Sequence, residues 1–153
     1  MSDCGTTNFS GSFSISTTVA STDLDESGFA ALTYTAIPNL GNHGDSGVSQ
    51  NIVNYSTWDR NVICKGKGEA DAGSPTVEFL DVDGAGLDLL IAAADVDNAN
   101  AYAFKLTWPD NSVEYNRGIV TGPMRLHGGN EDFKRVQFNL GFNQQPVIVA
   151  ATA

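Results

Sequence analysis

The amino-acid sequence predicts a single, mainly β domain spanning residues 1–153, with one short helix. A chain of 153 residues suits one domain, which at that length buries about 70% of its unfolded surface. Only 17% of the residues are charged and 16 are glycine, a balance typical of turn-rich β proteins. Apolar residues alternate with polar ones along most of the chain, and helical spacing appears in one stretch. No internal repeat or low-complexity linker divides these elements.

The N-terminal part of the sequence predicts two strands and a loop. Residues 9–19 alternate apolar side chains with serines, which predicts a half-buried strand with a small polar face. Its apolar positions are Phe9, Phe13, Ile15 and Val19. A second alternation includes Leu32 and Tyr34 and ends where Pro38 removes a backbone donor. Residues 39–47, "NLGNHGDSG", have the composition of a loop that is too polar to join a core.

Three further strands are expected in the middle of the chain. They lie in the segments "VSQNIVNYSTW", "NVICKGKG" and "PTVEFLDV", which are rich in β-branched and aromatic residues. Lys65 and Lys67 are expected in a solvated turn, although they also suit a small basic spot.

The acidic stretch that follows, residues 80–100, matches neither of the ligand motifs that it resembles. A calcium-binding EF-hand loop starting at Asp81 requires a bidentate acid at its twelfth position, which is Ala92. A dinucleotide-binding GxGxxG motif starting at Gly84 requires a third glycine, and that position is Leu89. The stretch therefore predicts neither a calcium site nor a phosphate-binding loop.

The same stretch predicts a short amphipathic helix that lies across a sheet. Four apolar residues follow the i, i+3, i+4, i+7 spacing and share one stripe. These docking residues are Leu87, Leu90, Ile91 and Ala94. Asp83 is placed to cap the start of the helix, and Asp88 lies in the first turn, where the helix dipole favours an anion.

The C-terminal third predicts a hairpin and a closing pair of strands. In "AYAFKLTWPDNSVEYNRGIV" the alternation is interrupted at Pro109 and Asp110, which suit the central positions of a type I turn. Tyr102, Phe104, Leu106 and Trp108 share one face, and after the turn Val113, Tyr115 and Ile119 resume the alternation. In "DFKRVQFNLGF" a second apolar face is formed by Val136, Phe138, Leu140 and Phe142, and "PVIVA" follows as the last strand.

Residue types that carry catalysis or bind cofactors are sparse. His43, Asp45 and Ser46 form a triad-like set, but a triad needs each group on a different part of a rigid scaffold. His43 and His127 are too far apart in sequence, without a third ligand, to predict a metal site. Cys4 and Cys64 suit two free thiols in a reducing compartment or a single disulfide. We therefore expect no enzyme activity and no cofactor or metal.

The charge distribution excludes ordinary binding to nucleic acid. Lys and Arg number 8 against 18 Asp and Glu, a net charge of −10, whereas phosphate neutralisation requires bases. An anionic surface nevertheless suits a protein that lets DNA pass without binding it. The sequence shows no secretory signal and no apolar run of membrane-spanning length, so we expect synthesis in a cytosol and no membrane partner.

The order of these elements resembles the major tail tube protein of long, non-contractile bacteriophage tails, whose fold is shared with type VI secretion tube proteins. The resemblance covers residues 29–150 by layout. It is carried by four segments: "AIPNLGNHGDSG", "GLDLLIAAAD", "FKLTWPDNSVEYNRGIV" and the C-terminal strand pair.

This resemblance implies a β-sandwich or partly closed barrel with one flanking helix. Six copies would join sheet edges into a ring-shaped β-barrel, and rings would stack head to tail into a tube in the virion tail. DNA and the tape-measure protein would pass through it, and tail-tip or terminator proteins would cap it, after synthesis in the bacterial host cytoplasm. The resemblance also implies that an early loop reaches the next ring. Its residues here are Asn39, Leu40, Asn42, His43, Asp45 and Ser46.

Three other functions fit the same elements. A tail-terminator or connector protein would form one ring without polymerising. A carbohydrate-binding β-sandwich would use exposed aromatic residues, such as Trp58 or Trp108, as stacking platforms. A hydrolytic enzyme would lose turnover on substitution of His43 or His127.

Overall fold

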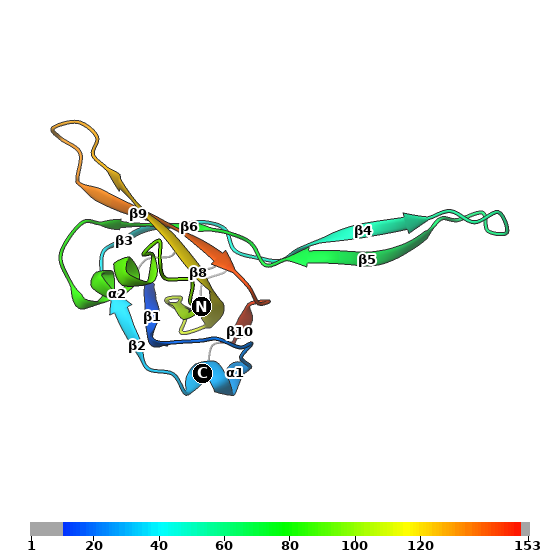
Figure 1. Ribbon diagram of the computed structural model, residues 1–153, viewed down its shortest axis with the longest axis horizontal. Coiled ribbons are helices and arrows are strands. Elements are labelled where there is room, and N and C mark those ends of the chain that lie inside the picture. Colours follow the sequence, from blue (N-terminus) through cyan, green and yellow to red (C-terminus); the bar gives the residue numbers. More distant parts are fainter. Residues whose placement is uncertain (1–10, 151–153) are drawn as a thin grey trace.

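The computed structural model describes residues 11–150, and within them it shows a mainly β, sandwich-like fold with two helices (Figure 1). Phe9 and Cys4 lie outside the described residues. In chain order the elements are β1 (Ser12–Val19), α1 (Glu26–Ala30), β2 (Tyr34–Ile37), β3 (Leu40–His43), β4 (Ser49–Tyr55), β5 (Cys64–Asp71), β6 (Thr76–Leu80), α2 (Ala85–Ala93), β7 (Tyr102–Thr107), β8 (Val113–Leu126), β9 (Arg135–Phe142) and β10 (Val147–Val149). In this range neither helix is long and apolar enough to cross a lipid bilayer.

Eight strands form one antiparallel sheet. Seven follow the order β2-β1-β7-β8-β9-β6-β3, and β10 pairs with the first residues of β8. The two outer strands, β2 and β3, are consecutive in sequence and joined by Pro38 and Asn39 alone. The sheet therefore curls until its edges approach each other, although it does not close into a barrel.

The long strand β8 has a free edge over its second half. Residues 113–118 pair with β7, whereas residues 118–126 pair with β9 only, with a register shift between Thr121 and Met124. An unpaired strand edge offers backbone donors and acceptors to another chain. This edge, together with the outer sides of β2 and β3, is left unpaired in the described part of the monomer.

The main core lies between the curled sheet and α2. The alternation in β9 was predicted correctly, because Val136, Phe138 and Leu140 are all fully buried there. Phe13 of β1 stacks on Phe104 of β7 with ring centroids 5.8 Å apart. A register shift after Ile15 leaves Val19 exposed, so its predicted place on the buried face is wrong.

A smaller core lies around α1, a helix that the sequence analysis missed. Phe29 is its one buried side chain and stacks on Tyr115 of β8, with ring centroids 5.2 Å apart. Asp25 caps this helix by accepting a hydrogen bond from the Gly28 amide, and that bond lowers the pKa of the Asp25 carboxyl. The helix is only five residues long, too short for a periodic signal in the sequence.

Helix α2 packs against the sheet in the predicted stretch. Its N-cap is Gly84 without a side-chain cap, so the predicted capping role of Asp83 is wrong. Asp88 lies in the first turn as expected. A side chain at Gly86 would place its Cβ 2.3 Å from the Ala36 carbonyl oxygen, so glycine is required by the close approach of α2 to β2.

Candidate functional site

The most prominent feature of the molecule is an arm, residues 49–71, formed by β4 and β5. Figure 1 shows this hairpin extending away from the rest of the chain along the longest axis. The two strands pair antiparallel from Ser49 opposite Asp71 to Tyr55 opposite Cys64. Within the described residues, neither hydrophobic core includes a residue of the arm. The arm therefore contributes nothing to the packing that stabilises the body.

The arm exposes large apolar side chains that a monomer leaves in water. Trp58 at the tip is fully exposed, and the others are at least half exposed. These residues are Ile52, Val53, Tyr55, Trp58, Val62 and Ile63. A concentration of exposed apolar side chains in one segment is typical of an interaction site or of a liability to aggregate. The sequence predicted strands in both segments, and β4 and β5 confirm them.

The distal arm, residues 52–67, also carries positive charge. It contains three bases, Arg60, Lys65 and Lys67, and one acid, Asp59. The rest of the chain holds five bases and 17 acids. Lys65 and Lys67 lie in strand β5, so their predicted place in a turn is wrong. The distal arm therefore has the opposite charge from the remaining chain.

The arm leaves the body through two glycines that lie against each other. Gly73 has a φ of 96°, a backbone angle that residues other than glycine rarely adopt. A Cβ at this position would lie 3.0 Å from the Gly47 carbonyl oxygen. The Asp71 carboxylate accepts a hydrogen bond of 2.9 Å from the Gly73 amide. These contacts fix the direction in which the arm leaves the sheet.

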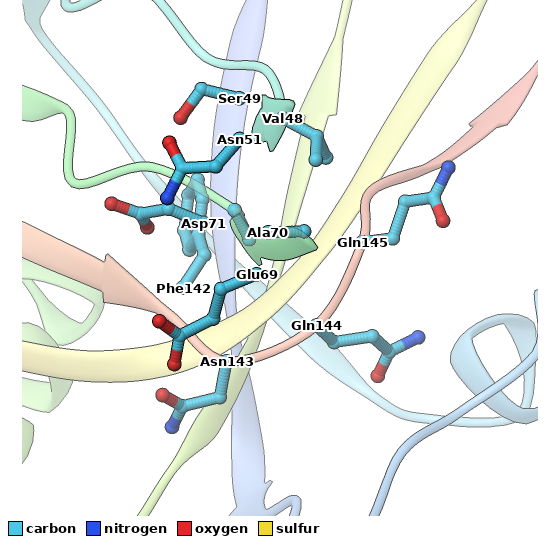
Figure 2. Close-up of a pocket in the computed structure, with 11 residues that line it drawn as sticks. Val48, Ser49, Asn51, Glu69, Ala70, Asp71, Phe142, Asn143, Gln144 and Gln145 are labelled. Atoms are coloured by element: carbon cyan, nitrogen blue, oxygen red, sulfur yellow. The ribbon is translucent and has the colours of Figure 1, made fainter. Parts of the chain in front are cut away.

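A polar hollow of about 700 Å³ lies where the arm meets the body. We call it the root hollow; it is lined by residues 48, 49, 51, 69–72 and 142–145. Figure 2 shows the carboxylates of Glu69 and Asp71 on the same side of the view as the carboxamides of Asn51 and Asn143. Together they present an anionic, acceptor-rich wall.

The β9–β10 side of the root hollow is tied to the body. The Gln144 carboxamide accepts a hydrogen bond of 2.9 Å from the Leu24 amide and donates another to the Leu24 carbonyl. The Asn143 amide donates to the Arg117 carbonyl at 2.8 Å. The wall is therefore preorganised before any partner arrives.

The predicted loop at residues 39–47 is partly a strand. Leu40–His43 form β3, which pairs with β6, and Leu40 packs against the main core. The His43 ring lies 5.6 Å from the Phe13 ring. The interpretation that this segment is too polar to join a core is therefore wrong, because its spacing places Leu40 and His43 against the sheet while Asn39, Asn42 and Asp45 stay exposed.

The triad-like set has no catalytic geometry. The Ser46 hydroxyl donates to both Glu114 carboxylate oxygens at 3.0 Å. His43 Nδ1 contacts the Gly44 carbonyl at 2.6 Å, and no hydrogen bond in residues 11–150 joins His43 to Ser46. A nucleophile needs its base within hydrogen-bond reach. His127, the other histidine, is exposed in the β8–β9 connection.

The predicted docking residues of α2 lie on its sheet-facing side. Leu87, Leu90 and Ala94 are buried in the main core, and Ile91 is partly buried against it. Leu90 has no exposed surface.

Three buried polar residues of β8 were missed by the sequence analysis. Glu114 and Asn116 are buried on one face, and Arg117 donates to the Ala20 carbonyl and to Asp23 on the other. Charged and amide side chains are usually exposed to solvent. The signal available was their position between the apolar residues of a central strand.

The acidic stretch before α2 is held by bases. The Asp81 carboxylate lies 2.7 Å from an Arg125 guanidinium nitrogen and 3.3 Å from Lys134 Nζ. Both bases belong to the projecting end of the β8–β9 hairpin. Asp81 therefore links this hairpin to the end of β6.

Two solved structures share this fold over nearly the whole chain. A chain of the six-fold symmetrised anti-feeding prophage baseplate has a TM-score of 0.68 and 9% identity, with 100% of both chains covered. A chain of the PVC sheath/tube terminator, from an extracellular contractile injection system in the extended state, has a TM-score of 0.66 and 12% identity. That match covers 95% of this chain and 97% of the other. The fold of this chain is therefore shared with one chain of a prophage baseplate and one of a sheath/tube terminator.

No family model and no curated protein matches the sequence. The similarity is therefore one of backbone architecture.

Proposed function

We propose that this chain is a structural, non-enzymatic subunit of a tail-like tube. Six copies form a ring, and rings stack head to tail into a conduit for DNA and a tape-measure protein within a virion tail. The observation that carries the proposal is the arm, because its apolar surface packs against no other part of residues 11–150. The six-fold symmetrised baseplate with the same fold supports the number of copies.

Ring closure would use the unpaired strand edges. The second half of β8 pairs on one side only, and β2 and β3 are the outer strands of the sheet. Edges exposed in a monomer favour aggregation, whereas a closed ring pairs them with neighbouring copies. The surplus of acids suits a lumen that repels DNA and keeps it mobile.

Ring stacking would use side chains on and beside β3, while the outer backbone edge of that strand serves ring closure. The exposed side chains of Asn39, Asn42 and Asp45 remain our candidates for the contact with the next ring. Leu40, His43 and Ser46 would act indirectly, since contacts within the body already hold them. Tail-tip and terminator proteins would bind the two ends of the stack.

A terminator or connector ring is the second candidate function. It is favoured by the likeness to a chain of the PVC sheath/tube terminator structure, which is as extensive as the likeness to the baseplate chain. Such a protein would form one ring and present its second face to a different partner.

Negative-stain electron microscopy of the purified protein tests both candidates. Long tubes are expected for a tube subunit, and single rings for a terminator. A uniformly monomeric protein across the accessible concentration range would contradict the assembly function in both forms.

A further inference from the structure

We propose that the distal arm of one copy docks in the root hollow of the next copy. This inference rests on the proposed function and names the contact that links its subunits. The tip of the distal arm does not lie in the root hollow of its own copy, because Figure 1 shows the hairpin extended away from the body. The contact is therefore between different surfaces of two identical chains.

Charge complementarity favours a second copy as the occupant. The distal arm carries Arg60, Lys65 and Lys67 against the single acid Asp59. The root hollow presents Glu69 and Asp71 and, within the described residues, no Lys or Arg lines it. Opposite charges on the two surfaces speed association and fix their relative position.

The apolar and polar chemistry of the two surfaces also matches. Trp58 presents a large ring with an N–H donor, and buried tryptophan is a frequent anchor of protein interfaces. The hollow offers Phe142 as an apolar lining and carboxamide and carboxylate oxygens as acceptors. Arg60 donates one hydrogen bond to Cys64 Sγ at 2.6 Å and keeps further N–H donors, and the side chains of Lys65 and Lys67 have no hydrogen-bond or ion-pair partner among residues 11–150. The hollow supplies acceptors for these donors.

The length of the arm fits the spacing of neighbouring subunits. From Ser49 to Trp58 an extended strand spans about 30 Å, at about 3.3 Å per residue. A body of about 120 residues has a radius of gyration of about 14 Å, hence a diameter of about 35 Å. Equivalent points on touching copies are separated by about that diameter. The tip of one arm therefore reaches the root of the next.

Such a contact propagates the assembly. It joins two different patches, so each copy offers both a free arm and a free hollow to further copies. Repetition of this contact gives a ring if the rotation closes and a filament if it does not.

Photo-crosslinking tests the contact directly in the assembled full-length chain. A benzophenone amino acid replaces Trp58, and the same group at the exposed Val96 is the matched control. We expect intermolecular crosslinks from position 58 to peptides containing residues 48–51, 69–72 or 142–145, and none of these from position 96. The docking proposal would be overturned if position 58 crosslinks only to other surfaces. It would also be overturned if the yield of intermolecular crosslinks from position 58 does not exceed that from position 96.

Charge reversal tests the electrostatic part. Arg60→Glu, at the tip beside Trp58, and Glu69→Lys are each expected to lower the yield of the arm–root crosslink about tenfold, and mixing the two variants to restore it. Glu131→Lys makes the same charge change on an exposed loop outside both surfaces and should leave the yield unchanged. Equal yields in all variants, or no recovery on mixing, would contradict this pairing.

Microscopy of the same samples separates this inference from the proposed function. Six-fold rings whose Trp58 crosslinks map elsewhere would retain the function and remove the arm–root contact. Crosslinking of position 58 to added DNA or anionic lipid in place of a second copy would also overturn the docking proposal.

Discussion

Two glycines of the body lie where a side chain has no room. A Cβ on Gly118 would lie 2.1 Å from the Gly141 carbonyl oxygen, and a Cβ on Gly86 would lie 2.3 Å from that of Ala36. In both cases the obstacle is backbone, which cannot move aside as a flexible side chain does. The pairing of β8 with β9 and the packing of α2 on β2 therefore require glycine at these two positions.

Gly118→Ala is expected to destabilise the fold by about 1–3 kcal/mol, the usual cost of overpacking a well-packed site. The matched control is Gly66→Ala in the arm, where a Cβ meets nothing within 4 Å, and a change within about 0.5 kcal/mol is expected. Urea unfolding measures both free energies. Equal values for the two variants would contradict the packing described for β8 and β9.

Leu90→Ala is expected to cost about 2–5 kcal/mol, because it empties a fully buried position between α2 and the sheet. Val96→Ala, at a nearly fully exposed position after the same helix, should change stability by less than about 0.5 kcal/mol. Thermal unfolding followed by circular dichroism compares them. A mild effect at Leu90 would mean that α2 does not dock on this core.

Calcium is expected to leave the melting temperature unchanged. The Asp81 carboxylate is already paired with Arg125 and Lys134, so binding a cation there would require breaking two ion pairs. A ligand present at 100 times its dissociation constant would add about 2.7 kcal/mol to stability. A calcium-dependent rise that disappears in Asp81→Asn would disprove this account of the acidic stretch.

Among the secondary-structure elements, the strands were easier to predict than whether each strand lies in the buried sheet or projects from it. The alternation of Val136, Phe138 and Leu140 correctly predicted a buried strand. The turn at Pro109 and Asp110 between β7 and β8 also formed as expected, since the Asn111 backbone amide donates to the Trp108 carbonyl. The segments around Ile52 have the same β-branched composition as buried strands. Composition cannot tell a strand buried by its own chain from one covered by a neighbour.

The candidate site was predictable only in part for the same reason. The sequence drew attention to residues 39–47 because glycine and asparagine favour turns, yet backbone pairing to β6 makes half of this segment a strand. The arm was hidden because nothing in the spacing of its residues distinguishes a projecting hairpin from one in a sheet. The root hollow joins residues about 70 positions apart, which a local pattern does not connect.

Removal of the distal arm is expected to separate folding from assembly. Replacing residues 52–67 with Asn-Gly leaves a short hairpin with a favourable turn and removes no residue of either core. The variant should unfold cooperatively at the parent's midpoint in urea while losing higher assemblies in sedimentation velocity. Parent-like assembly of this variant would show that the arm is not a subunit contact.

In the whole molecule, different parts of the fold provide stability and offer surfaces for other copies. The curled sheet and its helices bury most of the phenylalanines, whereas the arm and the free strand edges have no partner within residues 11–150 of a single copy. A net charge of −10 opposes the approach of two bodies, so the cationic distal arm would offset part of that repulsion.

Native mass spectrometry of the purified chain tests the central claim, assembly in rings of six, most directly. The account predicts that the dominant species has the mass of six chains. Any larger species should have a mass that is a multiple of six chains. A distribution limited to monomers, or assemblies whose masses are not multiples of six chains, would contradict it.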